Sequence, residues 1–145
     1  MNTRQARILI IDDEEVVRRS FTRILEGNCK VQAVWNWYQV AQAMQEDPAD
    51  VVLLDLRMPE MDGISVLKAL KQRWPESEVI VVTGYPTLET AKQAVSLGAY
   101  DYLTKPVNPD QVIHASNAAW LHKRWALHRD RGAARGQSDS SRTTS

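Results

Sequence analysis

Side chains that could do chemistry stand at the ends of four strand-like segments of the sequence. In chain order, one of these segments ends in two Asp residues, the next in one Asp and the next in a Thr-Gly pair, and a Lys follows the last. These residues are Asp12 and Asp13, Asp55, Thr83 and Gly84, and Lys105. The carboxyl ends of parallel strands share one edge of a sheet, and ligands of such sheets bind at that edge. We therefore expect these side chains to meet.

Three carboxylates at close range cannot all stay ionised without a counter-ion. Oxygen ligands without an imidazole or a thiolate suit Mg²⁺. A carboxylate that faces such a neutralised pocket can accept a phosphoryl group, with Mg²⁺ and Lys105 neutralising the phosphoryl oxygens. The Thr83 hydroxyl and a backbone N–H at Gly84, where the glycine leaves room for close approach, can hold the remaining oxygens. The residue types thus predict a phosphoryl-acceptor site.

The segments between these residues predict the sheet that positions them. Five β-type runs alternate with helical patterns, and the second run is polar enough for a sheet edge. The runs are Arg7–Asp12, Lys30–Val34, Val51–Asp55, Val79–Thr83 and Ala99–Leu103. The helical patterns are Glu14–Glu26, Tyr38–Glu46, Ile64–Trp74, Thr87–Leu97 and a last helix that opens at Asn108. Five βα repeats predict an α/β, flavodoxin-like, doubly wound (βα)5 fold with a five-stranded parallel sheet.

Composition narrows the class of protein. The chain has 145 residues, of which 43% are hydrophobic and 25% charged, as in a single globular domain. The formal net charge is zero, so no overall field favours nucleic acid or an anionic membrane. The single cysteine, Cys29, excludes an internal disulfide framework. Because we find neither a signal-peptide pattern nor a long apolar run, we expect a cytoplasmic protein with no membrane partner.

Four motifs occur together in this chain. They are IIDDE at Ile10–Glu14, VLLDLRMPEMDG at Val52–Gly63, VVTG at Val81–Gly84 and DYLTKP at Asp101–Pro106. In this combination the chain closely resembles the receiver domain of bacterial response regulators, over roughly residues 5–120. Each motif alone is weak evidence for this family, but the combination of the four is highly specific for it.

The resemblance implies a role for each residue of the site. Asp55 is the phosphorylated aspartate, which receives its phosphoryl group from the phosphohistidine of a sensor histidine kinase or a histidine phosphotransfer protein. Mg²⁺ is held by Asp12, Asp13, Asp55 and the backbone carbonyl of Arg57. Lys105 pairs with a phosphoryl oxygen.

The resemblance also implies a conformational switch. The Thr83 hydroxyl moves toward the phosphoryl group, the Tyr102 ring turns inward, and the face made by helix four, strand five and helix five shifts. The Lys105–Pro106 bond is expected to be cis, because cis bonds are nearly confined to proline. The implied function is a phosphorylation-dependent switch of a two-component system. It is a phosphoprotein with self-catalysed phosphotransfer and slow autodephosphorylation, not an enzyme in the usual sense.

The sequence bears on three alternative functions. The chain could be the N-terminal receiver fragment of a larger transcriptional regulator whose output domain is absent. Direct nucleic-acid binding by these residues is not supported, because they contain no helix-turn-helix pattern. A phosphohydrolase of the haloacid-dehalogenase type needs Asp-x-Asp after the first strand, whereas Glu14-Glu15 follow Asp13 here.

The chain divides into three predicted parts. Residues 1–120 form the receiver domain, residues 121–130 extend the last helix, and residues 131–145 form a disordered tail, because they contain no large apolar group. Leu121, Trp125 and His128 recur at helical spacing. They lie either on an exposed extension or linker, or in a contact. That contact would be with the kinase or with a second copy of the chain, formed on phosphorylation. The expected core stripe of the last helix is Val112, Ile113, Ser116, Ala119 and Trp120.

Two further features admit a structural reading. The segment Trp35–Tyr38 contains three aromatic residues, with Trp37 where receiver domains often have glycine. It either packs locally around its turn or binds a partner. The three histidines, His114, His122 and His128, lie on the last helix without an obvious acidic partner, so we interpret them as surface residues.

Overall fold

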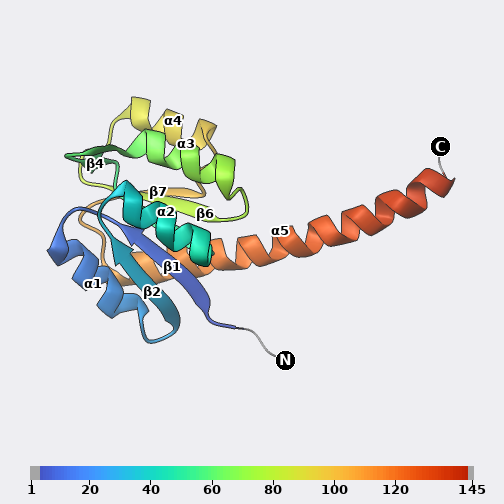
Figure 1. Cartoon of the computed structure of the whole chain (residues 1–145), viewed down its shortest axis with the longest axis horizontal. Helices are drawn as coiled ribbons and strands as arrows, with labels where there is room; N and C mark the ends of the chain where they lie inside the picture. Colours follow the sequence, from blue (N-terminus) through green and yellow to red (C-terminus); the bar gives the residue numbers. More distant parts are fainter. Residues whose placement is uncertain (1–3, 144–145) are drawn as a thin grey trace.

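A single parallel sheet forms the centre of the protein. The computed structural model describes the backbone of residues 4–143 and the side chains of residues 4–129. The strands are β1 (Ala6–Ile11), β2 (Cys29–Val34), β3 (Val51–Leu54), β6 (Glu78–Thr83) and β7 (Asp101–Thr104). They pair in parallel in the order β2-β1-β3-β6-β7 (Figure 1). This is the predicted flavodoxin-like, doubly wound sheet.

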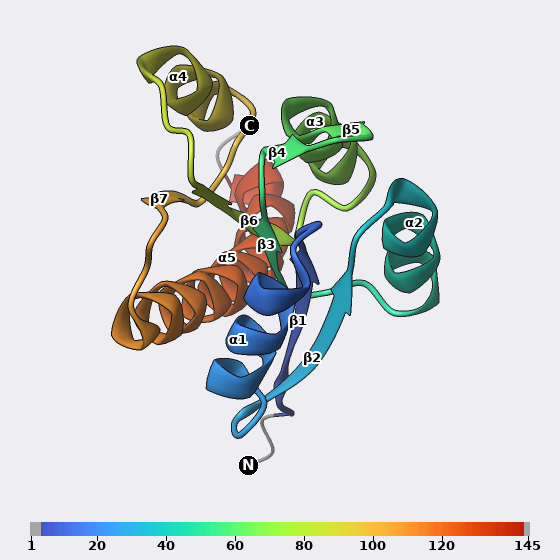
Figure 2. The ribbon, with the colours of Figure 1, turned by 90° about the vertical axis from the view of Figure 1, so that its left-hand side faces the viewer.

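Helices cover both faces of the sheet. They are α1 (Glu15–Leu25), α2 (Trp37–Glu46), α3 (Gly63–Arg73), α4 (Leu88–Ser96) and α5 (Pro109–Thr143). The end-on view shows α1 and α5 on one face and α2 and α3 on the other, with α4 beyond α3 (Figure 2). Each face therefore has its own hydrophobic layer.

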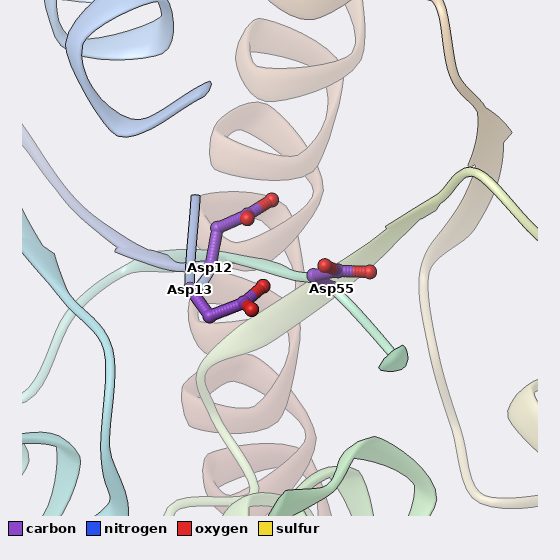
Figure 3. Close-up of side chains that lie close together, drawn as sticks. All are labelled: Asp12, Asp13 and Asp55. Atoms are coloured by element: carbon purple, nitrogen blue, oxygen red, sulfur yellow. The ribbon is translucent and has the colours of Figure 1, made fainter. Parts of the chain in front are cut away.

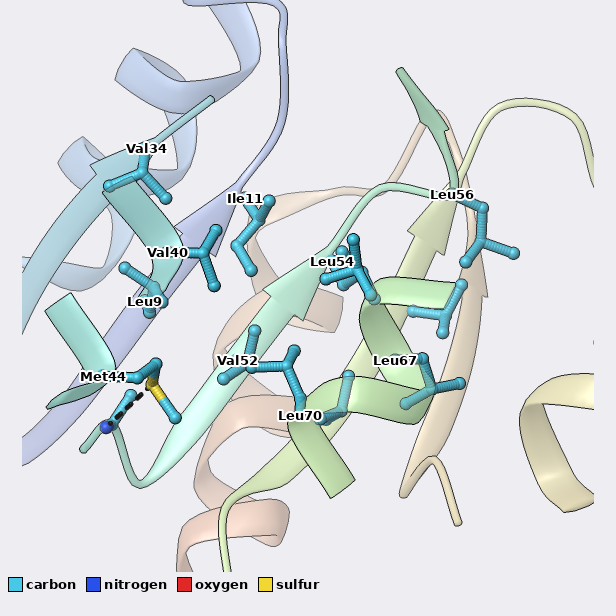
Figure 4. Packing of buried hydrophobic residues seen from close by; sticks show 14 of the residues in the cluster. Leu9, Ile11, Val34, Val40, Met44, Val52, Leu54, Leu56, Leu67 and Leu70 are labelled. Carbon is cyan, nitrogen blue, oxygen red and sulfur yellow. Dashed lines mark hydrogen bonds between the residues drawn. The ribbon is translucent and has the colours of Figure 1, made fainter. Parts of the chain in front are cut away.

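Alternation along the strands divides the core between these layers. Leu9 and Ile11 of β1 pack with residues of α2 and α3 (Figure 4). Ile8 and Ile10 pack with residues of α1 and α5. Every side chain of β3 and β6 is buried, as expected for strands covered on both faces. The side chains of β2 are mostly partly or fully exposed, which confirms its predicted place at an edge.

A two-stranded hairpin follows the acceptor strand and was not predicted. Its strands are β4 (Arg57–Met58) and β5 (Met61–Asp62), and strands this short have no detectable period in the sequence. A Cβ atom on Gly63 would lie 2.3 Å from the Cα atom of Leu56. Glycine at this position therefore allows the chain to fold back against the end of β3.

Polar residues cap the starts of two helices. The Asn36 side chain accepts a hydrogen bond from the Gln39 backbone at the start of α2. Asn108 and Gln111 form a capping box at the start of α5, because each side chain accepts from the other's backbone N–H at 2.8 and 2.9 Å. The C-cap of α1 is Glu26, which has a right-handed conformation.

The buried stripe of α5 differs from the prediction at one position. Val112, Ala115, Ser116 and Ala119 are buried, and Trp120 packs against them in part. Ile113 is 37% exposed, and Ala115 is buried in its place. The buried residues have the spacing of one helix face, and Ile113 lies beside that face.

The helix α5 continues well past the sheet, as Figure 1 shows. Its backbone is helical through Thr143, whereas the composition of residues 131–145 predicts an unstructured tail. Elongation of an existing helix needs no new nucleus. Residues 144–145 lie outside the described part of the chain. The predicted boundaries after residues 120 and 130 remain predictions. Among the described residues, no helix is both long enough and apolar enough to span a membrane.

A buried carboxylate attaches α5 to the end of the sheet opposite the predicted site. Asp50 is completely buried and accepts hydrogen bonds from both terminal nitrogens of Arg4 at 2.8 Å and from the Arg7 backbone at 2.8 Å. The Lys123 ammonium lies 2.6 Å from the same carboxylate. One side chain thus joins the N-terminal segment to the last helix.

His122 has an acidic partner that was not predicted. Its Nδ1 atom is hydrogen-bonded to the Glu78 carboxylate, and the Lys71 ammonium lies 3.9 Å from the other Glu78 oxygen. The His122 ring also lies against Tyr100 and Trp125, with ring centroids 5.1 and 5.9 Å away. Glu78 and His122 are 44 positions apart in the sequence, so only the tertiary fold brings them together.

The aromatic segment at the start of α2 is partly packed. Trp37 lies against the core near Met61, and the Arg73 guanidinium lies 5.6 Å from its ring centroid. Trp35 and Tyr38 remain 49% and 74% exposed. Local packing, the first of the two interpretations, therefore accounts for Trp37, and the Arg18 guanidinium also lies 4.6 Å from the Trp35 ring centroid. Tyr38 is the most exposed of the three aromatic residues.

Candidate functional site

The predicted residues meet at the carboxyl edge of the sheet. Asp12 follows β1, Asp55 follows β3, Thr83 ends β6 and Lys105 follows β7. Carboxylate oxygens of Asp12, Asp13 and Asp55 all lie within 4.8 Å of one another (Figure 3). Asp12 and Asp55 are buried, whereas Asp13 is exposed. The cluster is therefore open to solvent on the Asp13 side.

Backbone hydrogen bonds hold the ends of neighbouring strands in line. The Asp55 N–H donates to the Ile11 carbonyl at 2.9 Å, and the Lys105 N–H donates to the Thr83 carbonyl at 2.8 Å. Each bond continues the sheet one step past a strand. The acceptor carboxylate and the lysine are thereby attached to the rigid part of the molecule. The Lys105–Pro106 peptide bond is cis, as predicted.

Lys105 connects the carboxylates. Its Nζ atom lies 2.8 Å from Asp12, 3.5 Å from Asp55 and 3.5 Å from Glu14. Burial lowers the pKa of Lys105, but the hydrogen bond to Asp12 and the surrounding carboxylates outweigh that effect and raise it. The side chain therefore remains an ammonium ion at neutral pH.

The two buried carboxyl groups are short of positive charge. Burial raises the pKa of Asp12 despite hydrogen bonds from Lys105 and the Glu14 backbone. Burial also raises the pKa of Asp55, and the neighbouring Asp12 raises it further, although the Arg57 backbone N–H donates to Asp55 at 3.2 Å. One ammonium does not neutralise this cluster, and the hard oxygen donors suit a divalent cation.

Thr83 and Gly84 border the same space. Thr83 is fully buried, and its hydroxyl accepts a hydrogen bond from the Tyr85 backbone at 3.1 Å. A Cβ atom on Gly84 would have only the Lys105 side chain nearby, at 3.8 Å. Packing alone therefore does not require glycine here, and the space beside it belongs to an open cleft of about 710 Å³ lined in part by Asp13, Asp55 and Lys105.

An arginine–tyrosine pair at the cleft was not predicted. The Arg57 guanidinium lies 4.1 Å from the centroid of the Tyr85 ring, and both residues line the cleft. The sequence places Arg57 and Tyr85 each two residues after a predicted site residue, Asp55 and Thr83 respectively. Asp55 follows β3 and Thr83 ends β6, and these strands are neighbours in the sheet, but the contact between the two side chains was not predicted.

Tyr102 has a hydrogen-bond partner that was also missed. Its hydroxyl lies 2.7 Å from the Thr90 hydroxyl in the first turn of α4. Tyr102 pairs with Val81 in the sheet, two residues from Thr83. No local pattern in the sequence connects Thr90 to the site.

The doubly wound sheet and the acidic cluster at its carboxyl edge define an α/β protein of the CheY-like type. The response regulator receiver domain family matches residues 8–117, and the chain belongs to that family. It is a signalling switch and not a classical enzyme.

Relatives of known sequence extend far beyond this chain. An NtrX-like response regulator of Rickettsia bellii is 43% identical over 111 residues, which cover 73% of this chain and 23% of that protein. The regulatory protein AtoC of Escherichia coli is 40% identical over 108 residues, with 73% and 23% covered. The DNA-binding transcriptional regulator NtrC of E. coli is 35% identical over 116 residues, with 79% and 25% covered. The chain thus spans about a quarter of these relatives.

Solved structures show the same fold. A CheY-like receiver domain protein from Methanospirillum hungatei superposes with a TM-score of 0.81 at 27% identity, covering 85% of this chain and 99% of that one. NtrX from Brucella abortus, in complex with ADP, superposes with a TM-score of 0.82 at 26% identity, covering 88% and 30%.

Proposed function

We propose that Asp55 accepts a phosphoryl group from the phosphohistidine of a sensor histidine kinase or a histidine phosphotransfer protein. The observation that carries this proposal is the position of the Asp55 carboxylate, which is held at a rigid strand end beside Lys105 and borders an open cleft. An incoming phosphoryl group can reach it from the cleft. Family membership supports the same assignment.

The transfer needs one nucleophile and several groups that stabilise negative charge on the phosphoryl oxygens. An Asp55 oxygen attacks phosphorus, the phosphorus–nitrogen bond breaks, and the electron pair leaves with the imidazole nitrogen of the partner. Lys105 stabilises the developing charge on a phosphoryl oxygen, while the Thr83 hydroxyl and the Gly84 backbone N–H bind the others. Attack of water on the resulting acyl phosphate reverses the signal slowly.

The carboxylate cluster is suited to Mg²⁺. Asp12, Asp13 and Asp55 would hold the ion together with the backbone carbonyl of Arg57, and water would complete its shell. When bound, the ion supplies positive charge that offsets carboxylate repulsion and phosphoryl charge. The raised pKa values of Asp12 and Asp55 support this proposal, because both carboxylates lack full compensation.

Mg²⁺ is expected to stabilise the folded protein. A cation that binds only the folded state at 100 times its Kd adds about 2.7 kcal/mol. For a domain of this size that is an increase in Tm of roughly 5–10 °C. Thermal melts with millimolar Mg²⁺ and with NaCl of matched ionic strength measure the effect. The Asp13→Asn variant, which removes an exposed ligand, should lose most of the increase. A wild-type Tm that Mg²⁺ does not change would contradict the site.

The signal would leave the site through Thr83 and Tyr102. The hydroxyl of Thr83 would move toward the phosphoryl group, and the Tyr102 ring would follow it inward. The two residues lie on adjacent strands, β6 and β7, which supports the coupling. The face formed by α4, β7 and α5 would change as a result.

We also propose that the receiver domain comprises residues 1–120, that residues 121–130 extend it, and that its output lies elsewhere in a longer cytoplasmic regulator. The relatives support this arrangement, because the match covers only about a quarter of their length. NtrC is a DNA-binding transcriptional regulator. A transcriptional output, carried by a domain outside these residues, is therefore the proposal for the whole protein.

Phosphorylation is expected to produce a homodimer. Leu121 and Trp125 are 61% and 55% exposed one turn apart on α5, so a second copy could cover them. We expect the mass from light scattering to double when beryllofluoride and Mg²⁺ are added. The Asp55→Asn variant should remain a monomer, and Leu121→Asp should prevent the change without preventing beryllofluoride binding. A wild-type mass that never changes would instead indicate a separate partner or output domain.

A further inference from the structure

One hydroxyl connects the predicted switch residue to helix α4. The Tyr102 hydroxyl, on β7, lies 2.7 Å from the Thr90 hydroxyl, at the third position of α4. Tyr102 is partly buried, and packing against the hydrophobic layer under α2 and α3 holds its ring only in part. The contact with Thr90 therefore helps to define where the ring lies.

The same Thr90 hydroxyl also belongs to the N-terminal cap of α4. The Thr90 backbone donates to the Thr87 hydroxyl at 3.0 Å, and the Thr87 backbone donates to the Thr90 hydroxyl at 3.3 Å. The Thr90 hydroxyl additionally lies 3.1 Å from the Thr87 carbonyl and 2.9 Å from the Thr87 hydroxyl. Together these contacts form a capping box.

These contacts compete for a small hydrogen-bonding capacity. A hydroxyl carries one proton and two lone pairs, yet Thr90 has four polar partners, three on Thr87 and one on Tyr102. If the Tyr102 hydroxyl moves away, the Thr90 hydroxyl can make one more hydrogen bond to Thr87. The position of the ring and the order of the α4 N-terminus are thereby coupled.

Helix α4 has little other attachment. Ala94 is its only buried residue, and Leu88 and Val95 are 73% and 71% exposed. A helix with so little buried surface depends more than usual on its cap and on single polar contacts. A change at Thr90 can therefore move or loosen the whole helix.

We infer that Thr90 is a positioning residue of the switch, which holds the Tyr102 ring where the structure places it and transmits its departure to the N-terminus of α4. This inference rests on the proposed function, because the movement of the Tyr102 ring on phosphorylation is part of the proposal above. Loss of one neutral hydrogen bond that only this ring position makes should shift the equilibrium away from that position about fivefold. A ligand that selects the other position would then bind more tightly by the same factor.

The experiment uses Thr90→Val, Tyr102→Phe, their double variant, and two controls in the full chain. The first two each remove the contact between the hydroxyls. Thr87→Ala removes part of the cap but keeps the Thr90 hydroxyl for Tyr102, whereas Thr90→Ser should restore wild-type behaviour. The readouts are the Mg²⁺–beryllofluoride affinity, the NMR shifts of the residue 102 ring without ligand, and hydrogen exchange of α4 amides.

The expected result is an approximately fivefold higher beryllofluoride affinity for Thr90→Val and for Tyr102→Phe, with no further gain in the double variant. Thr87→Ala should increase exchange in α4 without changing the ring shifts. Additive effects in the double variant, or ring shifts that Thr90→Val leaves unchanged, would overturn the inference. If wild-type protein does not bind beryllofluoride, the proposed function fails, while the ring shifts and amide exchange still test Thr90 separately.

Discussion

The Asp55→Asn variant is expected to gain no phosphoryl group from acetyl phosphate, whereas the wild-type protein gains one. The substitution replaces a nucleophilic carboxylate by an amide of nearly the same shape. An amide cannot form the acyl phosphate, so the loss of labelling should be complete. Intact-protein mass spectrometry with Mg²⁺ present measures the gain of a single phosphoryl group.

A matched control separates this effect from damage to the fold. Glu60 lies exposed in the turn between β4 and β5, close in sequence to Asp55, and Glu60→Gln should be labelled normally. Burial and Asp12 raise the pKa of Asp55, so the ionised Asp55 destabilises the folded state at neutral pH. Asp55→Asn should therefore melt at or above the wild-type temperature in the absence of Mg²⁺. Undiminished labelling of Asp55→Asn would place the acceptor on another residue.

The Asp50→Asn variant is expected to lose about 3 kcal/mol of the free energy of unfolding, the effect of removing one partner from a buried ion pair. Asp50 is completely buried, and the side chain of Lys123 beside it is only 11% exposed. The amide keeps the shape of the carboxylate but leaves the Lys123 ammonium without its counter-charge. Urea denaturation, with the slope of the transition compared between variants, measures the loss.

An exposed ion pair of the same chemical type provides the control. Asp47 and Arg7 lie 3.0 Å apart, but the Asp47 side chain is 59% exposed. Asp47→Asn should therefore lose less than about 1 kcal/mol. Equal losses for Asp50→Asn and Asp47→Asn would show that burial adds nothing to the Asp50 pair.

The contribution of Asp50 should also depend on pH in a defined direction. Burial raises the pKa of Asp50, but hydrogen bonds from Arg4, Lys123 and the Arg7 backbone outweigh burial and lower it. A carboxyl group with a lowered pKa in the folded state stabilises that state above the pKa of the unfolded chain, about 4. The stability difference between wild type and Asp50→Asn should be constant near neutral pH and shrink as the pH falls below 4. A difference that grows in acid would contradict this assignment.

Much of the fold could be predicted because its signals are local. Continuous apolar runs such as Val51–Leu54 identify strands covered on both faces, and Asn36 and Asn108 mark helix starts through contacts within four residues. A parallel sheet then places the ends of these strands side by side without further information. The assembly of Asp12, Asp55 and Lys105 at one edge follows from that rule alone.

Contacts between distant elements could not be predicted in the same way. Which residue of α5 faces the core depends on the rotation of that helix against the sheet, so Ala115 is buried and Ile113 is not. The pairing of Thr90 with Tyr102 requires the position of α4 over β7, and that of Arg57 with Tyr85 requires the hairpin that follows β3.

The succession of strands and helices along the chain and the residue types at the carboxyl edge thus follow from the amino-acid sequence, because each depends on neighbours in the chain or on the parallel arrangement of the strands. The support of those groups depends instead on how distant elements pack in the folded protein. Asp50 and Lys123 are 73 positions apart, and Glu78 and His122 are 44 apart. Such pairs depend on how whole elements pack, and many different sequences of charged residues would be compatible with the same local patterns.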